Sequence, residues 1–437
     1  MTSFQTLREL LEPTENGRRL KAMEGLRGMA VLMVFCVHFD SAFGGLVPPQ
    51  SWAARLLHVA AVLGHYGVDI FFIISGYLIY GAVMQNTRLR YTRFLRRRVR
   101  RIYPTFLVVL GLYLLVSVLL PQRSKVPNTA IAAALFVGAN VLLLPGITSV
   151  QPIISVAWSL SYEFCFYAAI PVVVTVFGFC RLGRRGRVTV FLTLGAAFIG
   201  LCGLSASPER PLHMVGSPTH LRMMFFVVGI LVYELRNDRA ESKASTLRDA
   251  LASGLVLVVL SIAYWLREGV GLPEAAGLKQ YPGIYEFLVL GIGFGSFAFR
   301  VVTTDAILAK VLSVRPLRWL GNMSYSYYLI HGLTINAVAL GVSVLTNKPA
   351  GHAGYLLLFF MLCLMASVGV SFLLFGFVEG PFSLAQRGTE KLHSPGSNVS
   401  QTASIVSEVL PSLNATGNAQ DSELLKDSAV DGGGGRF

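Results

Sequence analysis

The sequence predicts an all-α, polytopic integral membrane protein with about ten transmembrane helices and one further helix that is re-entrant or interfacial. Two observations support this fold class. Of the 437 residues, 54% are hydrophobic and 14% are charged, whereas soluble domains carry about 25% charged residues. Apolar runs recur from Val31 to Phe377, and they have the length of about 17–25 residues that a helix needs to cross a bilayer.

The apolar runs define ten expected transmembrane helices. They cover residues 29–47, 60–83, 102–120, 158–180, 188–205, 220–236, 249–266, 282–300, 319–345 and 353–379. An eleventh apolar piece, 129–145, lies between two basic clusters, the eight arginines of Arg88–Arg101 and the four arginines of Arg181–Arg187. Because cytoplasmic loops are rich in Lys and Arg, both clusters should be cytoplasmic, and the chain must cross an even number of times between them.

The segment 129–145 would make that number odd, so it is expected to be a re-entrant or interfacial helix. Gly138, Asn140 and Pro145 also make it a poor membrane span. The remaining basic loops then place both termini in the cytoplasm of a multi-pass protein of the cell (inner or plasma) membrane. The net charge of +14 is explained by this orientation, so no nucleic-acid partner is expected.

The expected domains are a cytoplasmic N-terminal segment, 1–28, a transmembrane domain, 29–380, and a disordered cytoplasmic tail, 381–437. The tail is rich in Ser, Asn and Gly and poor in apolar residues. No clear internal repeat is present. The five cysteines lie in or beside apolar segments without CxxC or Cys/His spacing, so neither a disulfide framework nor a metal site is expected.

The first expected span contains His38, and Arg27 precedes it by eleven residues. Eleven helical steps are about three turns, so both side chains project from one face, roughly 16 Å apart along the axis. Ionisable groups inside a membrane span usually line a cavity or a substrate path. The pair therefore indicates a site. The alternative is a buried histidine bonded to the backbone, together with an arginine that reaches the interface.

Two carboxylates also lie inside expected spans. Asp69 belongs to the string Gly67–Tyr77, in which Ser75-Gly76 permits a close helix approach. Its alternative role is a carboxylate favoured by a helix N-terminus. Glu163 lies several residues inside the span that begins at Trp158, and Tyr167 is one turn further on the same face. A buried glutamate there indicates a functional or hydrogen-bonding role.

His331 lies about twelve helical steps inside the span 319–345, near the depth of His38. Tyr327 and Tyr328 are within one turn and can hydrogen-bond its ring. A catalytic and a structural histidine both fit this position.

The arginine string before the third span ends in Tyr103 and Pro104. Its density exceeds what orientation requires. Guanidinium groups bind phosphates in a bidentate manner, so Arg97, Arg98 and Arg101 are candidates to bind a phosphorylated cytoplasmic donor. Contact with anionic lipid headgroups is the alternative.

Together and in this order, the motifs resemble the acyltransferase 3 family of integral membrane acyltransferases, from about Leu20 to Phe382. The matching strings are Glu24–Gly28 with His38, Gly67–Tyr77, Arg97–Pro104, Trp158–Glu163 and Ser324–His331. The family topology of ten spans with both termini inside agrees with the charge pattern. Some members carry an extracytoplasmic SGNH hydrolase-like domain after an extra span, and this chain is expected to lack one.

The resemblance implies transfer of an acyl group, often acetyl, from a cytoplasmic thioester such as acetyl-CoA to a hydroxyl of a sugar or other acceptor. No metal is expected. An imidazole suits the roles of general base and nucleophile at neutral pH, so His38 is the candidate, and His331 shares the proton transfer. Membrane lipid and a carbohydrate or glycoconjugate acceptor are the expected partners.

The other residues take supporting roles in this scheme. Arg27 polarises the thioester or holds a donor phosphate. Arg97, Arg98 and Arg101, with Tyr103 beside them, bind the nucleotide end of acyl-CoA. Asp69 and Glu163 bind acceptor hydroxyls or orient His38.

The alternative function is a transporter or flippase of a glycan or lipid-linked substrate, because buried ionisable groups also suit proton-coupled movement. The arginine string and the missing inverted repeat favour the enzyme.

Overall fold

A computed structural model describes residues 18–85, 90–205, 218–236, 246–268, 282–303, 307–345 and 353–382. The chain divides into two compact units, Met1–Ser383 and Leu384–Phe437, and all described residues belong to the first. Within these ranges every regular element is helical, apart from one isolated bridge between Pro145 and Thr148. Residues 1–17 and all but the first two residues of the expected tail lie outside the described ranges, so the proposed domain boundaries stay predictions.

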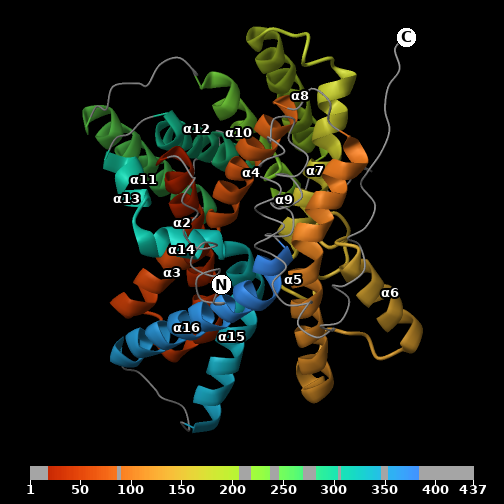
Figure 1. Ribbon diagram of the computed structural model, residues 1–437. Helices are drawn as coiled ribbons and strands as arrows, with labels where there is room; N and C mark the ends of the chain where they lie inside the picture. Colours follow the sequence, from red (N-terminus) through yellow and green to blue (C-terminus); the bar gives the residue numbers. More distant parts are fainter. Residues whose placement is uncertain are drawn as a thin grey trace, which may run out of the picture. The chain divides into compact units, whose positions relative to one another are not determined.

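Figure 1 shows the helices in chain order. The helices of twelve residues or more are α2 (Arg18–Phe43), α3 (Trp52–Gly64), α4 (Gly67–Met84), α5 (Tyr91–Leu119), α6 (Ala130–Val141), α7 (Trp158–Val176), α8 (Arg184–Ser205), α10 (Met224–Leu235), α11 (Thr246–Glu268), α12 (Pro282–Thr303), α15 (Ser324–Leu345) and α16 (Ala353–Leu374). The shorter ones are α9 (Pro218–Leu221), α13 (Ile307–Leu312) and α14 (Arg315–Asn322), and a π-helical turn, Phe375–Glu379, follows α16.

The polytopic, all-α fold class is confirmed. Nine helical stretches among the described residues are long and apolar enough to cross a membrane, and each overlaps one expected span. The remaining expected span, 220–236, forms α10, which has only 12 residues. The segment 129–145 forms α6, also of 12 residues, which is shorter than a helix needs to cross alone. The chain then reverses at Leu143 and Gly146, whose φ angles are 55° and 94°.

Two helix boundaries differ from the sequence-based expectation. α2 begins at Arg18, before the expected start at residue 29, and the expected helix 319–345 is broken at Met323 into α14 and α15. An ion pair of 2.9 Å between Glu24 and Arg318 joins the early turns of α2 to α14, the helix that ends at the break. Both side chains are buried, so α2 extends into the protein interior before its apolar run begins.

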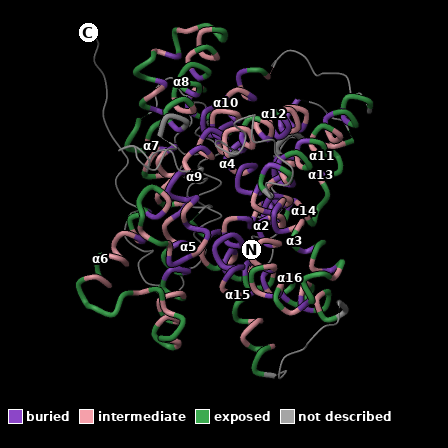
Figure 2. Tube along the Cα trace, turned by 180° about the vertical axis from the view of Figure 1, so that it is seen from behind, coloured by how far each residue is buried: buried purple, intermediate pink, exposed green. Residues whose placement is uncertain are grey.

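α2 is the central helix of the described region, in contact with α3, α4, α14 and α15. Figure 2 shows that the buried residues concentrate along α2, α4 and α10. The close helix approach expected at Gly76 is present between α4 and α10. A Cβ atom added at Gly76 would collide with the carbonyl of Phe226, and one at Gly229 would collide with the carbonyl of Ile73. This packing fixes α4, which carries site residues on two of its faces.

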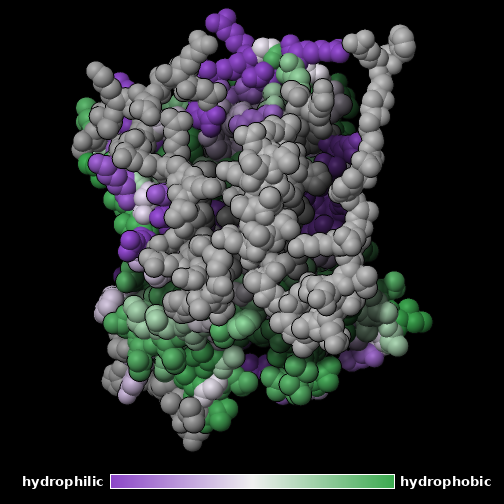
Figure 3. All heavy atoms as spheres, in the orientation of Figure 1, coloured by the Kyte–Doolittle hydropathy of each residue, from purple (hydrophilic) through white to green (hydrophobic). Residues whose placement is uncertain are grey.

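Hydrophobic side chains on the face shown in Figure 3 gather around α6 and α16, whereas hydrophilic ones gather toward the end near α8. Several large apolar side chains of α6 and α16 are exposed, including Ile131, Leu135, Leu357, Leu358 and Met365. Exposed apolar surface of this extent is typical of helices that face lipid.

Candidate active site

A cavity of about 110 Å³ lies between α2, α4, α5, α7 and α15. Its lining brings together three residues expected from the sequence, Arg27, Arg101 and Glu163. Six further polar side chains complete it: Ser75, Ser159, Tyr167, Ser324, Tyr325 and Tyr328. Polar residues from five helices thus converge on one cavity, as expected for ionisable groups within a membrane domain.

Hydrogen bonds fix the charged groups of this cavity. Arg27 donates to the hydroxyl of Ser324 over 2.8 Å. Glu163 accepts hydrogen bonds from the hydroxyls of Tyr167 and Ser75, the latter over 3.0 Å. The negative charge of Glu163 attracts Arg27, whereas Arg101 repels it. The cavity therefore presents two cationic groups and a carboxylate that is already hydrogen-bonded by two hydroxyls.

Glu379 belongs to the same charge cluster, and the sequence analysis did not single it out. It is buried in the π-helical turn after α16 and accepts two hydrogen bonds from Ser326, from the backbone N–H and the hydroxyl. Its charge interacts favourably with Arg27 and Arg101. A π-helical turn is frequent at functional sites, but it leaves no local sequence pattern.

The arginine side chains of α5 lie in different environments. Arg101 lines the cavity. The guanidinium of Arg98 lies 5.4 Å from the centre of the Tyr167 ring, so it approaches the same cavity from the side. Arg97 does not line it, and Tyr103 packs instead between the rings of Phe106 and Phe164. Of the four expected donor-binding residues, Arg101 lines the cavity and Arg98 contacts its wall through Tyr167.

His38 and His331 meet across the α2–α15 contact, with ring centres 5.0 Å apart and ring planes at 68°. His38 is half-buried and His331 is fully buried. The Nδ1 atom of His331 lies 3.0 Å from the carbonyl oxygen of Tyr327. Because a carbonyl only accepts, Nδ1 must donate there, and we therefore assign the lone pair of the neutral ring to Nε2. That Nε2 atom has no hydrogen-bond partner within the described ranges, so its lone pair can accept a hydrogen bond.

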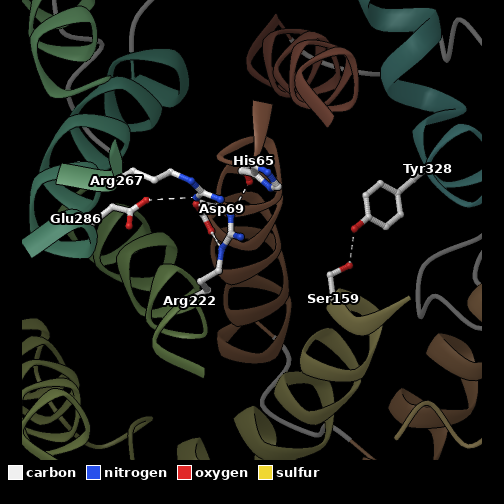
Figure 4. A network of polar contacts seen from close by, with 7 residues as sticks. All are labelled: His65, Asp69, Ser159, Arg222, Arg267, Glu286 and Tyr328. Atoms are coloured by element: carbon white, nitrogen blue, oxygen red, sulfur yellow. Dashed lines mark hydrogen bonds and ion pairs between the residues drawn. The ribbon is translucent and has the colours of Figure 1, made fainter. Parts of the chain in front are cut away.

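Tyr328 connects the histidine pair with the cavity. It lines the cavity, and its ring centre lies 6.1 Å from that of His331. Its hydroxyl is hydrogen-bonded to Ser159 over 2.8 Å, as Figure 4 shows. Neither histidine lines the cavity itself. The histidine pair thus lies next to the arginine-lined cavity, and the ring of Tyr328 contacts both.

Asp69 lies apart from this cavity. It forms a bidentate ion pair with Arg222, whose Nε and Nη2 atoms are 2.7 and 2.9 Å from the carboxylate oxygens. Arg222 also donates to the backbone oxygen of His65 over 2.5 Å (Figure 4), and it lies over the ring of Trp158. The sequence analysis missed Arg222 because it stands at the edge of an apolar run, where a charge is ordinary.

No group of three or more His, Cys, Asp or Glu side chains that could hold a metal ion occurs in the described part of the chain.

An acyltransferase domain family matches residues 20–376. The chain belongs to this family. Similar curated proteins include the peptidoglycan O-acetyltransferase OatA of Listeria monocytogenes, 26% identical over 327 residues, and the O-acetyltransferase OatA of Staphylococcus aureus, 24% identical over 347 residues. These alignments cover 71% and 75% of this chain but 48% and 52% of the relatives. The chain thus spans about half the length of the curated relatives it matches. No solved structure matches the chain.

Proposed function

We propose that this protein is a membrane O-acyltransferase that moves an acyl group from cytoplasmic acyl-CoA to a hydroxyl of a carbohydrate or glycoconjugate, with acetyl as the acyl group. Membership of the acyltransferase family and the names of the two relatives support the reaction class. The observation that carries the proposal is the contact of His38 with His331, 5.0 Å between ring centres, beside a cavity lined by Arg27 and Arg101.

The arginines are suited to an anionic donor. Arg98 and Arg101 lie on α5, and guanidinium groups bind phosphate oxygens in a planar, bidentate geometry. Arg27 is held by Ser324 and faces the same cavity. A donor whose phosphates bind on α5 would bring its thioester toward Arg27. A positive charge beside the thioester carbonyl stabilises the oxyanion that develops when the carbonyl is attacked.

The histidine pair is suited to the proton transfer. The acceptor oxygen attacks the thioester carbonyl, the C–O bond forms, the C–S bond breaks, and CoA leaves as a thiolate. A histidine ring takes the proton of the acceptor hydroxyl and returns it to the sulfur. His38 is the base that faces the acceptor, and the lone pair on Nε2 of His331 shares the proton. In an alternative route, His38 takes the acyl group first; both routes need its ring.

The test is acyl transfer by the purified protein in lipid nanodiscs, with labelled acetyl-CoA and peptidoglycan fragments as the first acceptor. His38→Ala should reduce kcat by about 10²–10⁴-fold, the usual contribution of a general base. His58→Ala is the matched control, because His58 is exposed on α3 and should leave kcat unchanged. Thermal unfolding of both variants shows that they are folded.

Two results would contradict the proposal. Turnover by His38→Ala at the wild-type rate would show that His38 is neither the general base nor the nucleophile. Movement of the acceptor across vesicles without acyl-CoA, and without acylation, would favour a transporter instead.

A further inference from the structure

A second polar cavity lies on another face of α4. It has a volume of about 210 Å³ and is lined by residues of α4, α10, α11 and α12, together with Leu221 and Arg222. Its charged groups are two arginines and two carboxylates: Asp69, Arg222, Arg267 and Glu286 (Figure 4). The formal charge of this lining is therefore balanced. A phosphate would need surplus cations, whereas a neutral, hydroxyl-rich ligand can donate to the carboxylates and accept from the guanidinium groups.

The two ion pairs of this cavity differ in the distance between their charged groups and in the exposure of their side chains. Arg222 binds Asp69 at 2.7 Å, and the Asp69 side chain is 2% exposed. Arg267 and Glu286 are 3.8 Å apart, and their side chains are 37% and 21% exposed. The looser pair, on α11 and α12, has hydrogen-bonding capacity to offer to a ligand, while the tighter pair fixes one wall of the cavity.

An apolar groove of about 800 Å³ begins where this polar cavity ends. Phe287 of α12 lines both spaces. From Phe287 the groove follows α12 to Phe299, a distance of about 18 Å along a helix. Its walls are mainly apolar residues of α8, α10, α11 and α12, among them Leu192, Val228, Leu231, Leu288 and Ile292, and they also include Ser296 and Arg300 of α12. A groove of this length and lining fits a single hydrocarbon chain.

We propose that the two spaces together bind an amphiphile, with a neutral, hydroxyl-rich headgroup in the polar cavity and its hydrocarbon chain in the groove, and that this amphiphile is the acyl acceptor. The acceptor role rests on the proposed function. The two cavities adjoin along α4, because Val68 lines the arginine-lined cavity and the next residue, Asp69, lines this one. A headgroup in this cavity therefore lies across α4 from the proposed active site, and the acceptor is a membrane-anchored glycoconjugate.

Gly291 provides a variant that fills the groove. A Cβ atom at Gly291 would meet Val228 and Phe287 at 3.6–3.9 Å, which is ordinary contact, so a side chain is accommodated and a leucine extends into the groove. Gly369 of α16 provides the matched control, because a Cβ atom there meets nothing within 4 Å. Leucine favours a helix over glycine at both positions.

The first experiment measures binding in nanodiscs with a dodecyl glucoside that carries a photoreactive diazirine on its chain. We expect cross-links on α10 and α12, reduced about tenfold in Gly291→Leu and unchanged in Gly369→Leu, a difference of about 1.4 kcal/mol. Unlabelled dodecyl glucoside should compete, and dodecylphosphocholine, with the same chain but a charged headgroup, should not. Equal labelling of the two variants, equal competition by both compounds, or cross-links spread over all lipid-facing helices would overturn the proposal.

The second experiment measures acetyl transfer to dodecyl glucoside and to methyl glucoside. Gly291→Leu should raise KM for dodecyl glucoside only. Transfer to both acceptors with unchanged KM values in this variant would overturn the groove assignment and leave the proposed function standing. Absence of any transfer from acetyl-CoA by the wild-type protein would instead overturn the proposed function, and with it the acceptor role.

Discussion

Glu379 and Ser326 are joined by two hydrogen bonds to the same carboxylate oxygen, 3.1 Å from the backbone nitrogen of Ser326 and 2.6 Å from its hydroxyl. Both residues are buried. The contact ties the turn after α16 to the first turn of α15, where negative charge is favoured by the helix dipole. Ser324, the hydrogen-bond acceptor of Arg27, lies in that same turn. The position of the Arg27 guanidinium therefore depends on Glu379.

Removal of this carboxylate should destabilise the protein. A hydrogen bond to a charged group contributes about 1.5–3 kcal/mol, so Glu379→Ala should lower the free energy of unfolding by at least that amount. Glu379→Gln should lose less, because a neutral acceptor remains. Thermal unfolding in nanodiscs measures both. In a double-mutant cycle, Ser326→Ala should add little to Glu379→Ala, since both break the same contact. Fully additive effects would show that the two side chains act independently.

Arg98→Ala and Arg101→Ala should mainly raise KM for acyl-CoA. Loss of one charge-assisted contact of about 1.5–3 kcal/mol corresponds to roughly 10–150-fold in affinity. Arg93→Ala is the control, because Arg93 lies on the same helix with an exposed side chain and does not line the cavity. Steady-state kinetics with varied donor measure the effect. If KM rises equally in all three variants, the string acts through its total charge or through lipid headgroups.

Asp69 should act chiefly as the partner of Arg222. Asp69→Ala leaves a largely buried guanidinium without its carboxylate, and breaking such a pair costs about 3–5 kcal/mol. Replacement of both residues by leucine should recover much of this stability, because a buried ion pair and an apolar pair are often equivalent. Thermal unfolding of single and double variants makes the comparison. A stable but inactive Asp69→Ala protein would show instead that Asp69 binds the acceptor or orients His38, as the sequence analysis expected.

The loop after α6 should face the outside of the cell. Thr148 is exposed, so a Thr148→Cys variant should react with a membrane-impermeant maleimide in intact cells. The unsubstituted protein provides the control, because its Cys180 is exposed beside the cytoplasmic cluster Arg181–Arg187 and should react only after the membrane is permeabilised. The Thr148→Cys change is made in a Cys180→Ser background, so that labelling reports on residue 148 and not on residue 180. Labelling of Thr148→Cys only in permeabilised cells would make α6 a true transmembrane helix.

Much of the fold could be predicted from the sequence, because apolar length and arginine position are properties of neighbouring residues. They predicted the long helices and singled out the segment 129–145, which forms the short α6. The break at Met323 and the early start of α2 escaped prediction. Both occur where α2 and α14 are joined by the ion pair between Glu24 and Arg318, which are 294 residues apart in the chain. Local patterns do not contain such a pairing.

The same reason explains what could be predicted of the site. Glu163 and His331 were recognisable because each is an ionisable group inside an apolar run, and Arg27 because it lies three helical turns before His38 on the same face. Arg222 and Glu379 were missed because they stand at the ends of such runs. Tyr103 was selected for its place in a motif, yet its ring packs against Phe106 and Phe164.

The shortness of α10 has a consequence for the membrane around it. Its 12 residues rise about 18 Å. A buried ion pair lies near each end, Arg222–Asp69 just before its start and Arg187–Glu234 in its last turn. The hydrocarbon layer of a bilayer is about 30 Å thick, so these charges cannot all reside at the headgroups. A hydrophobic helix this short is accommodated by local thinning of the bilayer or by side chains that reach toward the headgroups, so we expect the bilayer to be thinner beside α10.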